Sequence, residues 1–316
     1  MKKGFTLAEV LITMTIIGIV SAVAIPSLMS TTSQKALDNQ RHALYARMSN
    51  AISAMDKLGG YGMYDASDPD NIKDTAAKTF VVDGLQKVYK IKSVCDEGDY
   101  ASCGILDQYA TLYPDGRSFE SIASLYTHGS PYAAFHSGSA PKKVAFTTGN
   151  GESILLAYNP DCSPKAEAPS EKSICAMFLY DLNGAKKPNQ FGKDVGIIAA
   201  FYRKDPVVVA PIVDMNSYPG ENINMNYKKA AKRCADLGDD YRLPDVEEAF
   251  TIYQSSDFWF PVTNYQQMWT GIIKNLNEDG TNNIYVVYGD GSGTGGPTVT
   301  DSSHYSGNPA AICVRK

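Results

Sequence analysis

Residues 1–25, Met1-Lys-Lys-Gly4-Phe5-Thr-Leu-Ala-Glu9-Val-Leu-Ile-Thr-Met-Thr-Ile-Ile-Gly-Ile-Val-Ser-Ala-Val-Ala-Ile25, decide how this chain is organised. Two lysines are followed by an apolar run in which Glu9 is the one charged residue. A helix of about twenty residues spans about 30 Å, which matches the hydrocarbon thickness of a bilayer. The run therefore predicts a transmembrane helix, and the lysines place its start on the cytoplasmic side.

The junction between the basic and the apolar part carries a small residue, Gly4, directly before Phe5. A secretory signal peptide has its cleavage site after the apolar region instead. The junction resembles the class III leader of type IV pilins and pseudopilins, and Pro26 falls about where that family has a helix-kinking proline. The resemblance implies that a prepilin peptidase cuts after Gly4 and methylates Phe5. It also implies that Glu9 and Pro26 belong to the helix through which subunits assemble.

Glu9 has two interpretations. A carboxylate in a membrane segment costs about 2.5 kcal/mol or more near the bilayer centre and marks function. In the resembled family, this glutamate is thought to meet the new amino terminus of a neighbouring subunit, which here is Phe5. Such a buried pair can form only after Lys2 and Lys3 are removed. The alternative is a capping box in which Glu9 reaches back to its own helix start at Thr6; we favour assembly.

The composition and the resemblance together indicate which binding partners and which cellular location to expect. The 316 residues carry a net charge of −5 and no long basic run, so nucleic acid is not an expected partner. The resemblance implies other pilin subunits, the prepilin peptidase and the inner membrane of a bacterium as partners. We therefore expect insertion in the inner membrane before assembly, followed by an extracellular position in a pilus at the cell surface.

The helical pattern continues beyond the apolar run. An apolar stripe with helical spacing follows, formed by Leu37, Leu44, Met48, Ile52 and Met55. A pair of glycines at 59 and 60 then ends the helix. We predict a leader at residues 1–4 and a transmembrane and filament-core helix at residues 5–58.

Residues 59–205 have the pattern of a β-rich head. Short β-branched and aromatic runs alternate with turn signals. The predicted strands are residues 79–82, 142–148, 153–158, 174–180 and 195–202. We expect an antiparallel sheet packed on the long helix, a pilin-like α+β arrangement.

Residues 206–316 form the second predicted domain, because Pro206, Pro211 and Pro219 mark a boundary. Helices are predicted at residues 226–237 and 245–254, the second with Asp245 as its N-cap. Strands are predicted at residues 267–270, 283–288 and 310–315.

This C-terminal third resembles the C-type-lectin-like domains of bacterial surface proteins. The residues that carry the resemblance are Ala231–Gly238, Arg242-Leu-Pro244 with Glu247-Glu248, Met268-Trp-Thr270 and Ile312–Arg315. The resemblance implies a C-type-lectin-like α+β domain. The calcium motifs of the sugar-binding members, Glu-Pro-Asn or Gln-Pro-Asp and Trp-Asn-Asp, do not occur, which argues against calcium-dependent sugar binding.

Six cysteines in a chain directed outward suggest disulfides rather than catalysis. Six cysteines allow fifteen connectivities. Sequence proximity and domain layout favour three pairs: Cys95–Cys103, Cys162–Cys175 and Cys234–Cys313. A mixture with free thiols is the alternative.

The other motifs give little support for a metal site or a catalytic site. Asp181, Asn183 and Asp194 are weak calcium ligands, and a structured turn is the favoured interpretation. Glu247 and Glu248 are expected to be a solvated pair on a helix. No nucleophile stands in a recognisable motif with a base, so we predict no enzyme and no cofactor.

The sequence therefore predicts a structural and binding subunit of a type IV pilus, either minor or at the tip. Its helix polymerises and its lectin-like module mediates adhesion to a surface ligand, a glycan or a protein. The alternatives are a pseudopilin of a type II secretion system that engages exported cargo, or a DNA-uptake pilin.

Overall fold

The computed structural model describes residues 7–57, 76–96, 98–109, 143–158, 174–201, 207–209, 211, 227–254, 267–276, 282–288, 298–301 and 312–315. The chain divides into two compact units, residues 1–43 and 44–316. Helix α1 (Leu7–Lys57) confirms the long N-terminal helix, and its helical backbone continues through Pro26.

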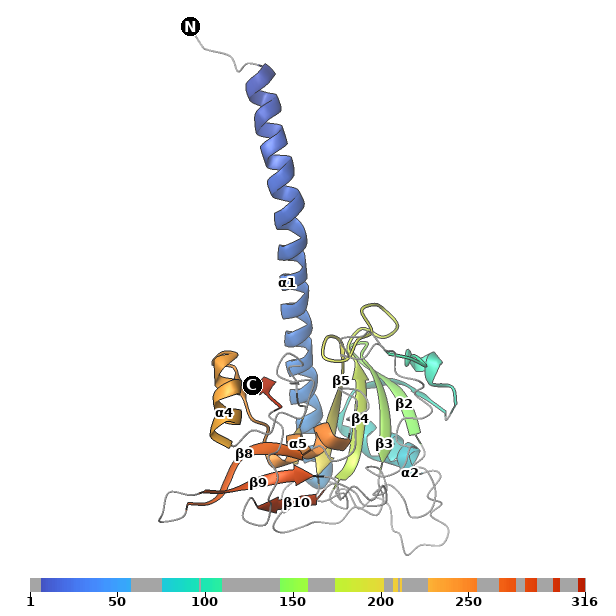
Figure 1. Ribbon diagram of the computed structural model, residues 1–316. Helices are drawn as coiled ribbons and strands as arrows, with labels where there is room; N and C mark the ends of the chain where they lie inside the picture. The colour runs from blue at the N-terminus through green and yellow to red at the C-terminus, as the bar shows by residue number, and fades with distance from the viewer. Residues whose placement is uncertain are drawn as a thin grey trace, which may run out of the picture. The chain divides into compact units, whose positions relative to one another are not determined.

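The second unit is built on a six-stranded antiparallel sheet whose strands follow one another in chain order (Figure 1). Its strands are β1 (Ile91–Cys95), β2 (Lys143–Thr148), β3 (Ser153–Tyr158), β4 (Ile174–Asp181), β5 (Val195–Phe201) and β6 (Val207–Val209). This confirms an α+β fold with an antiparallel sheet. Strands β3, β4 and β5 are buried along their whole length, because both faces of the sheet are covered.

Helical segments cover one face of the sheet. Phe80 stacks on Tyr158 of β3 with ring centroids 4.5 Å apart. Phe80 belongs to a helical stretch formed by α2 (Ala76–Thr79), the π-helix η3 (Phe80–Leu85) and α3 (Gln86–Val88). The predicted strand at residues 79–82 is therefore wrong. Burial of Phe80, Val81 and Leu85 on one helical face outweighs the local β preference of valine and threonine.

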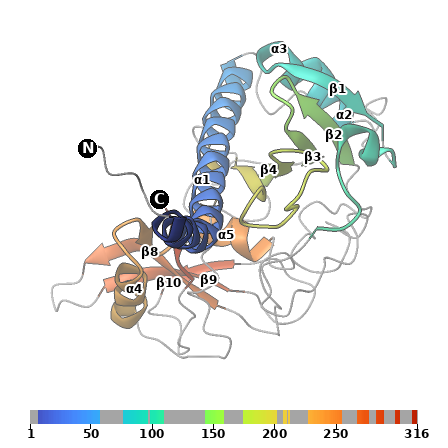
Figure 2. The ribbon, with the colours of Figure 1, turned by 90° about the horizontal axis from the view of Figure 1, so that it is seen from above.

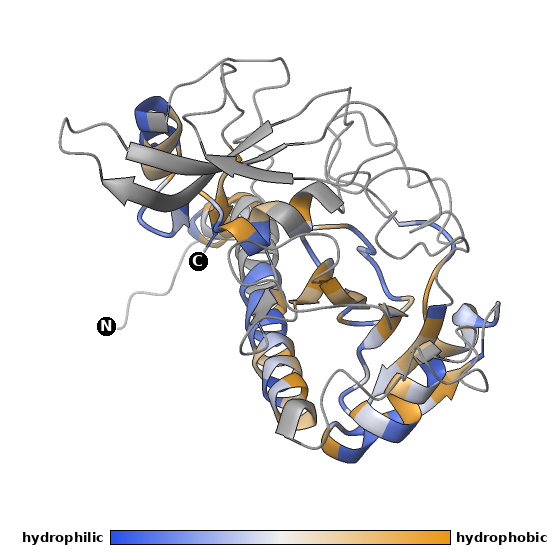
Figure 3. Ribbon diagram, turned by 90° about the horizontal axis from the view of Figure 1, so that it is seen from below, coloured by the Kyte–Doolittle hydropathy of each residue, from blue (hydrophilic) through white to orange (hydrophobic). Residues whose placement is uncertain are grey.

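The end of α1 buries four of the five residues of the predicted stripe, whereas Leu37 is partly exposed. Leu44, Met48, Ile52 and Met55 are each at most 4 % exposed. Figure 3 shows hydrophilic and hydrophobic residues alternating along this part of the helix. The amphipathic pattern thus fixes which side of the helix faces the core.

The other face of the sheet is covered by elements of the C-terminal third. One buried cluster joins sheet residues such as Leu155 and Leu179 to residues from the end of the chain. Those residues are Ala249 and Ile252 of α5 (Val246–Gln254), Ile312, and Val314 of β11 (Val314–Arg315). Helix α5 also contacts β8 (Gln267–Leu276) and β9 (Asn282–Tyr288), so it lies between the large sheet and the smaller one (Figure 2).

The remaining described elements are small. Strands β8 and β9 pair with each other, and β9 pairs with β10 (Thr298–Asp301). Helix α4 (Tyr227–Asp236) precedes β7 (Tyr241–Arg242), which pairs with β11. Strand β6 lies in the large sheet although it follows the predicted boundary at residues 205/206. Elements on the two sides of that boundary share one sheet and one core.

Candidate functional site

The beginning of α1 exposes a continuous apolar surface. Its large apolar side chains are each 44–80 % exposed: Leu7, Val10, Leu11, Ile12, Met14, Ile16, Ile17, Ile19 and Val20. The hydroxyls of Thr13 and Thr15 donate to the backbone carbonyls of Glu9 and Leu11 at 2.9 and 2.8 Å. Because these hydroxyls are satisfied within the helix, they add little polarity to the surface.

Glu9 is exposed within this stretch. Gly4, Phe5 and Thr6 lie outside the described residues, so the cleavage site and the two interpretations of Glu9 stay predictions. Within the part of the chain that the structure describes, no helix combines the length and the apolar composition that crossing a membrane requires.

A charged cluster holds the start of α5. The guanidinium of Arg242 donates to both carboxylate oxygens of Glu248, at 2.6 and 2.9 Å. Burial raises the pKa of Asp245 to about 6, and the neighbouring charge of Glu248 adds to the shift. Burial and these two carboxylates also raise the pKa of Tyr45 on α1. The cluster thus joins β7 to the start of α5, close enough to Tyr45 of α1 to affect its pKa.

The expectation that Glu247 and Glu248 are solvated is wrong. Their exposed fractions are 6 % and 8 %. Glu248 is buried because it caps its own helix and pairs with Arg242. A carboxylate with these partners is compensated for its lost hydration.

Two of the predicted cysteine pairs form disulfides. Cys95 and Cys103 are joined with their Cα atoms 6.0 Å apart, and Cys234 and Cys313 with theirs 5.4 Å apart. Cys175 is also disulfide-bonded, whereas its predicted partner, Cys162, lies outside the described residues. The Cys234–Cys313 bond connects α4 to the residue before β11.

The weak calcium candidates lie in a turn whose backbone N–H groups donate to three of their side-chain oxygens. Asp194 accepts hydrogen bonds from the N–H groups of Asn189 and Gln190 at 2.9 and 2.8 Å. Asp181 Oδ1 accepts from the N–H of Asn183 at 3.1 Å, and the described residues supply no hydrogen-bond partner for the buried Asp181 Oδ2 and Asn183 Oδ1. Calcium takes six to eight oxygen ligands. The turn does not fit that requirement.

The described residues were also compared with the requirements of other metal ions. Within the described residues, no group of three or more histidine, cysteine, aspartate or glutamate side chains is placed to hold a metal ion. Burial raises the pKa of Asp181 to about 7, and the charge of Asp194 adds to the shift.

The structure also brings together residues that the sequence did not single out. Arg47 of α1 pairs with Glu152, which directly precedes β3 and is 6 % exposed. Glu152 also accepts a hydrogen bond from Thr148 at the end of β2. A separation of 105 residues between Arg47 and Glu152 gives no local sequence signal for this pair.

The comparisons with known proteins agree with the N-terminal analysis. Residues 1–25 match the prokaryotic N-terminal methylation motif. This match supports a type IV pilin-like prepilin leader, which implies processing by a prepilin peptidase and other pilin subunits as partners. Comparison with curated proteins and with solved structures gave no match.

Proposed function

We propose that this chain is a structural subunit of a type IV pilus that assembles through α1 and uses its C-terminal third for adhesion. The observation that carries the proposal is an N-terminal methylation motif followed by an exposed apolar helix face. Exposed apolar surfaces of this extent mark association with other molecules. Neighbouring copies of the same helix provide the matching apolar partner.

The proposed sequence of events follows from the leader. The precursor sits in the inner membrane, cleavage after Gly4 frees Phe5, and the trimmed helix then enters an extracellular pilus. Glu9 pairs with the amine of Phe5 of a neighbouring copy, which compensates both charges where water is excluded. Pro26 lies in the same assembly helix.

The proposed adhesive part is a C-type-lectin-like module on a minor or tip subunit, and it binds rather than catalyses. What supports it is the order of elements: helix α4, the Arg242-Leu-Pro244 turn, helix α5, strand β8 and the terminal strand β11. The surface ligand in this proposal is a glycan or a protein.

Two alternatives have different consequences. A pseudopilin of a type II secretion system would engage exported cargo and would not mediate attachment. A DNA-uptake pilin would need a basic surface. Helix α4 offers Lys228, Lys229, Lys232 and Arg233, but Lys232 pairs with Asp236 at 2.8 Å, and two further aspartates follow at 239 and 240. This balance of charges does not favour DNA.

The assembly proposal is tested with Glu9→Gln and Glu9→Asp variants in cells. Both variants should be cleaved after Gly4, which mass spectrometry of the mature N-terminus detects together with methylation of Phe5. Glu9→Gln should lose filaments because it removes the charge, whereas Glu9→Asp should retain part of the assembly. Wild-type filament numbers in Glu9→Gln would overturn the proposal.

Adhesion needs a separate test that leaves the core intact. Deleting residues 207–316 is unsuitable, because it removes β6 from the large sheet and α5 and β11 from its second face. Residues 289–296, Gly-Asp-Gly-Ser-Gly-Thr-Gly-Gly, have the composition of a loop, and loops often carry binding function. Replacing this segment in the full chain keeps β6, α5 and β11. Attachment should fall while filament number stays unchanged. Unchanged attachment combined with failed cargo export would favour the secretion pseudopilin.

A further inference from the structure

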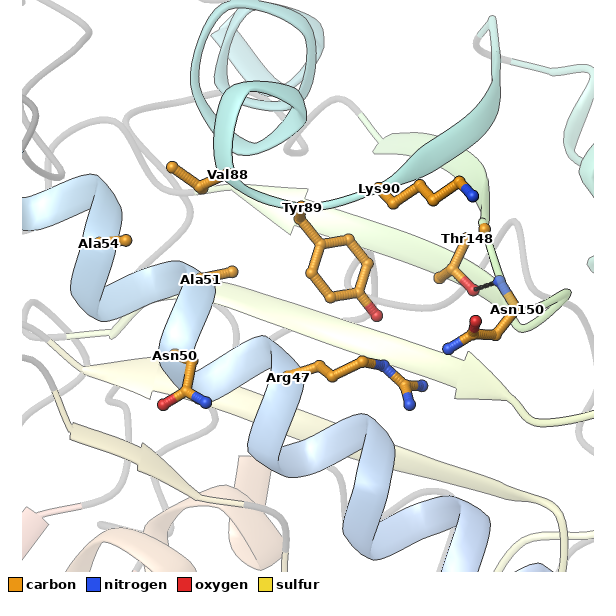
Figure 4. Close-up of a pocket in the computed structure, with 10 residues that line it drawn as sticks. Arg47, Asn50, Ala51, Ala54, Val88, Tyr89, Lys90, Thr148 and Asn150 are labelled. Atoms are coloured by element: carbon orange, nitrogen blue, oxygen red, sulfur yellow. Dashed lines mark hydrogen bonds between the residues drawn. The ribbon is translucent and has the colours of Figure 1, made fainter.

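A pocket of about 470 Å³ lies between the end of α1, the segment that joins α3 to β1, and the turn between β2 and β3 (Figure 4). One end of it is lined mostly by the apolar side chains of Ala51, Ala54 and Val88, with the amide of Asn50 beside Ala51. Arg47 and Asn150 lie at the other end, with Tyr89 between the two. Pockets for small molecules start at about 300 Å³, so this one has room for a small ligand.

The polar wall of the pocket is fixed before any ligand arrives. Arg47 pairs with the buried carboxylate of Glu152, and the N–H of Asn150 donates to Thr148 Oγ1 at 3.3 Å. The N–H of Gly149 donates to the carbonyl of Lys90 at 2.8 Å. The stem of Lys90 lies so close to Gly149 that a Cβ atom there would come within 2.6 Å of it. These contacts hold Arg47 against Glu152 and the stem of Lys90 against Gly149.

The pocket contains a buried hydroxyl donor for which the described residues supply no acceptor. Tyr89 is 7 % exposed, and among the described residues its hydroxyl donates to no acceptor, while the Arg47 guanidinium faces it as a donor. Figure 4 shows this hydroxyl pointing toward the guanidinium of Arg47. Several effects act on the pKa of Tyr89, and the largest of them, burial, raises it. The hydroxyl therefore keeps its proton at neutral pH. A buried hydroxyl without an acceptor is costly, which indicates that an acceptor belongs there.

The guanidinium of Arg47 has more N–H donors than its neighbouring acceptors use. A guanidinium carries five N–H donors. Glu152 takes one of them, and Asn150, with its amide oxygen turned toward Arg47, accepts from both terminal nitrogens at 3.1 and 3.2 Å. In Figure 4 the hydroxyl of Tyr89, the guanidinium of Arg47 and the ammonium of Lys90 all lie toward the end of the pocket that Asn150 lines.

The formal charges define the ligand. Arg47 and Lys90 are positive and Glu152 is negative, so the polar end carries one net positive charge. We propose that this pocket binds a small organic ligand through one carboxylate, held by Tyr89, Arg47 and Lys90, with its short apolar part at the alanine-lined end. This inference goes beyond the filament proposal and does not depend on it.

The carboxylate has two sources, a free small acid or an acidic group of a peptide, and the experiment distinguishes them. The full-length protein in a neutral detergent is titrated with propionate and glucuronate as free acids, and with a blocked glutamate dipeptide as the peptide group. The methyl esters serve as uncharged controls and inorganic phosphate as a dianion. Isothermal calorimetry or ligand-observed NMR reports binding.

Two variants test the site itself. Tyr89→Phe removes only the hydroxyl that lacks an acceptor among the described residues, so it should fold at least as well as the wild type and weaken carboxylate binding about 10-fold. Lys90→Gln should weaken binding similarly. Lys87→Gln, an exposed lysine on α3, is the matched charge control and should leave binding unchanged. Arg47 is left intact, because its loss would strand the buried Glu152.

The binding measurements can support or contradict the carboxylate site. Saturable binding of a free acid or of the dipeptide, lost in the ester and weakened by Tyr89→Phe and Lys90→Gln, supports the site and names the source. Equal binding of ester and acid, tighter binding of phosphate, binding that ignores both variants, or no saturable binding of any probe would overturn it. None of these results depends on filament formation.

Discussion

Asp245 and Glu248 cap the start of α5 for each other. The N–H of Glu248 donates to Asp245 Oδ1 at 2.7 Å, and the N–H of Asp245 donates to Glu248 Oε2 at 2.9 Å. This reciprocal arrangement is a capping box, which satisfies two backbone donors that a helix start leaves open. Arg242 completes it by binding the Glu248 carboxylate from β7. The Arg-Leu-Pro turn therefore positions the helix that covers the second face of the large sheet.

The capping role of Asp245 predicts an order of stabilities. Asn accepts the same N-cap hydrogen bond as Asp, whereas Ala accepts none, so Asp245→Ala should be less stable than Asp245→Asn by about 1 kcal/mol. Comparing the two variants with each other removes the effect of the lost charge. Urea unfolding at neutral pH measures the difference. Equal stability of the two variants would show that Asp245 does not cap α5.

The pairing of Arg242 with Glu248 predicts a larger effect. Breaking a fully buried ion pair costs about 3–5 kcal/mol. The Arg242 side chain is 38 % exposed, so Arg242→Met should lower the free energy of unfolding by less, about 2 kcal/mol. Arg242→Lys should cost about 1 kcal/mol, since lysine cannot bind both oxygens in the same fork. Arg233→Met on α4 is a control for losing an arginine; an equal loss there would contradict the assignment.

Much of the secondary structure was accessible from the sequence because its signals are local. The spacing of Leu44, Met48, Ile52 and Met55 predicted which side of α1 is buried, and four predicted strands of the large sheet occur within two residues of their expected bounds. The N-cap at Asp245 needed only an acidic residue before an apolar helical pattern. Residues 76–88 show the limit of local signals. Ala77, Phe80, Val81 and Leu85 have a helical spacing, but the β-branched composition of this stretch favours a strand.

The rest depends on contacts between distant residues. Strand β1 was missed because its edge position leaves most of it partly exposed, with no alternation to find. The domain boundary that the prolines after residue 205 predict stays a prediction, and no local sequence signal indicates that α5 and β11 pack against the large sheet. The pocket was missed for the same reason, since Tyr89, Arg47 and Asn150 come from three separate elements.

The two disulfides should contribute unequally. Cys95 and Cys103 are 8 residues apart, whereas Cys234 and Cys313 are 79 apart. A disulfide that closes a longer loop removes more entropy from the unfolded chain, about 2–3 kcal/mol for the short loop and about 4–5 kcal/mol for the long one. Double serine variants of each pair should differ in that order in urea unfolding. The reverse order would show that native contacts around the short loop dominate.

Asp181 should make stability fall as the pH rises. Its pKa is about 7 in the folded protein because of burial and the charge of Asp194, against an ordinary value of 3.8. Between these values the folded state holds a proton that the unfolded state has lost, so each step up in pH favours unfolding. The contribution of Asp181 to the free energy of unfolding is constant below pH 3.8 and is fully lost above about pH 7. The total change is up to about 4 kcal/mol.

The Asp181→Asn variant isolates this effect. Asparagine keeps an oxygen for the N–H of Asn183 and carries no charge for Asp194 to repel. Measured by urea unfolding, the variant should match or fall below the wild type at about pH 4 and exceed it at about pH 8. Asp107→Asn, which replaces an exposed carboxylate, controls for the loss of one negative charge and should leave the wild-type slope unchanged. A wild type that gains stability relative to Asp181→Asn as the pH rises would show that the ionised carboxylate is favoured in the fold.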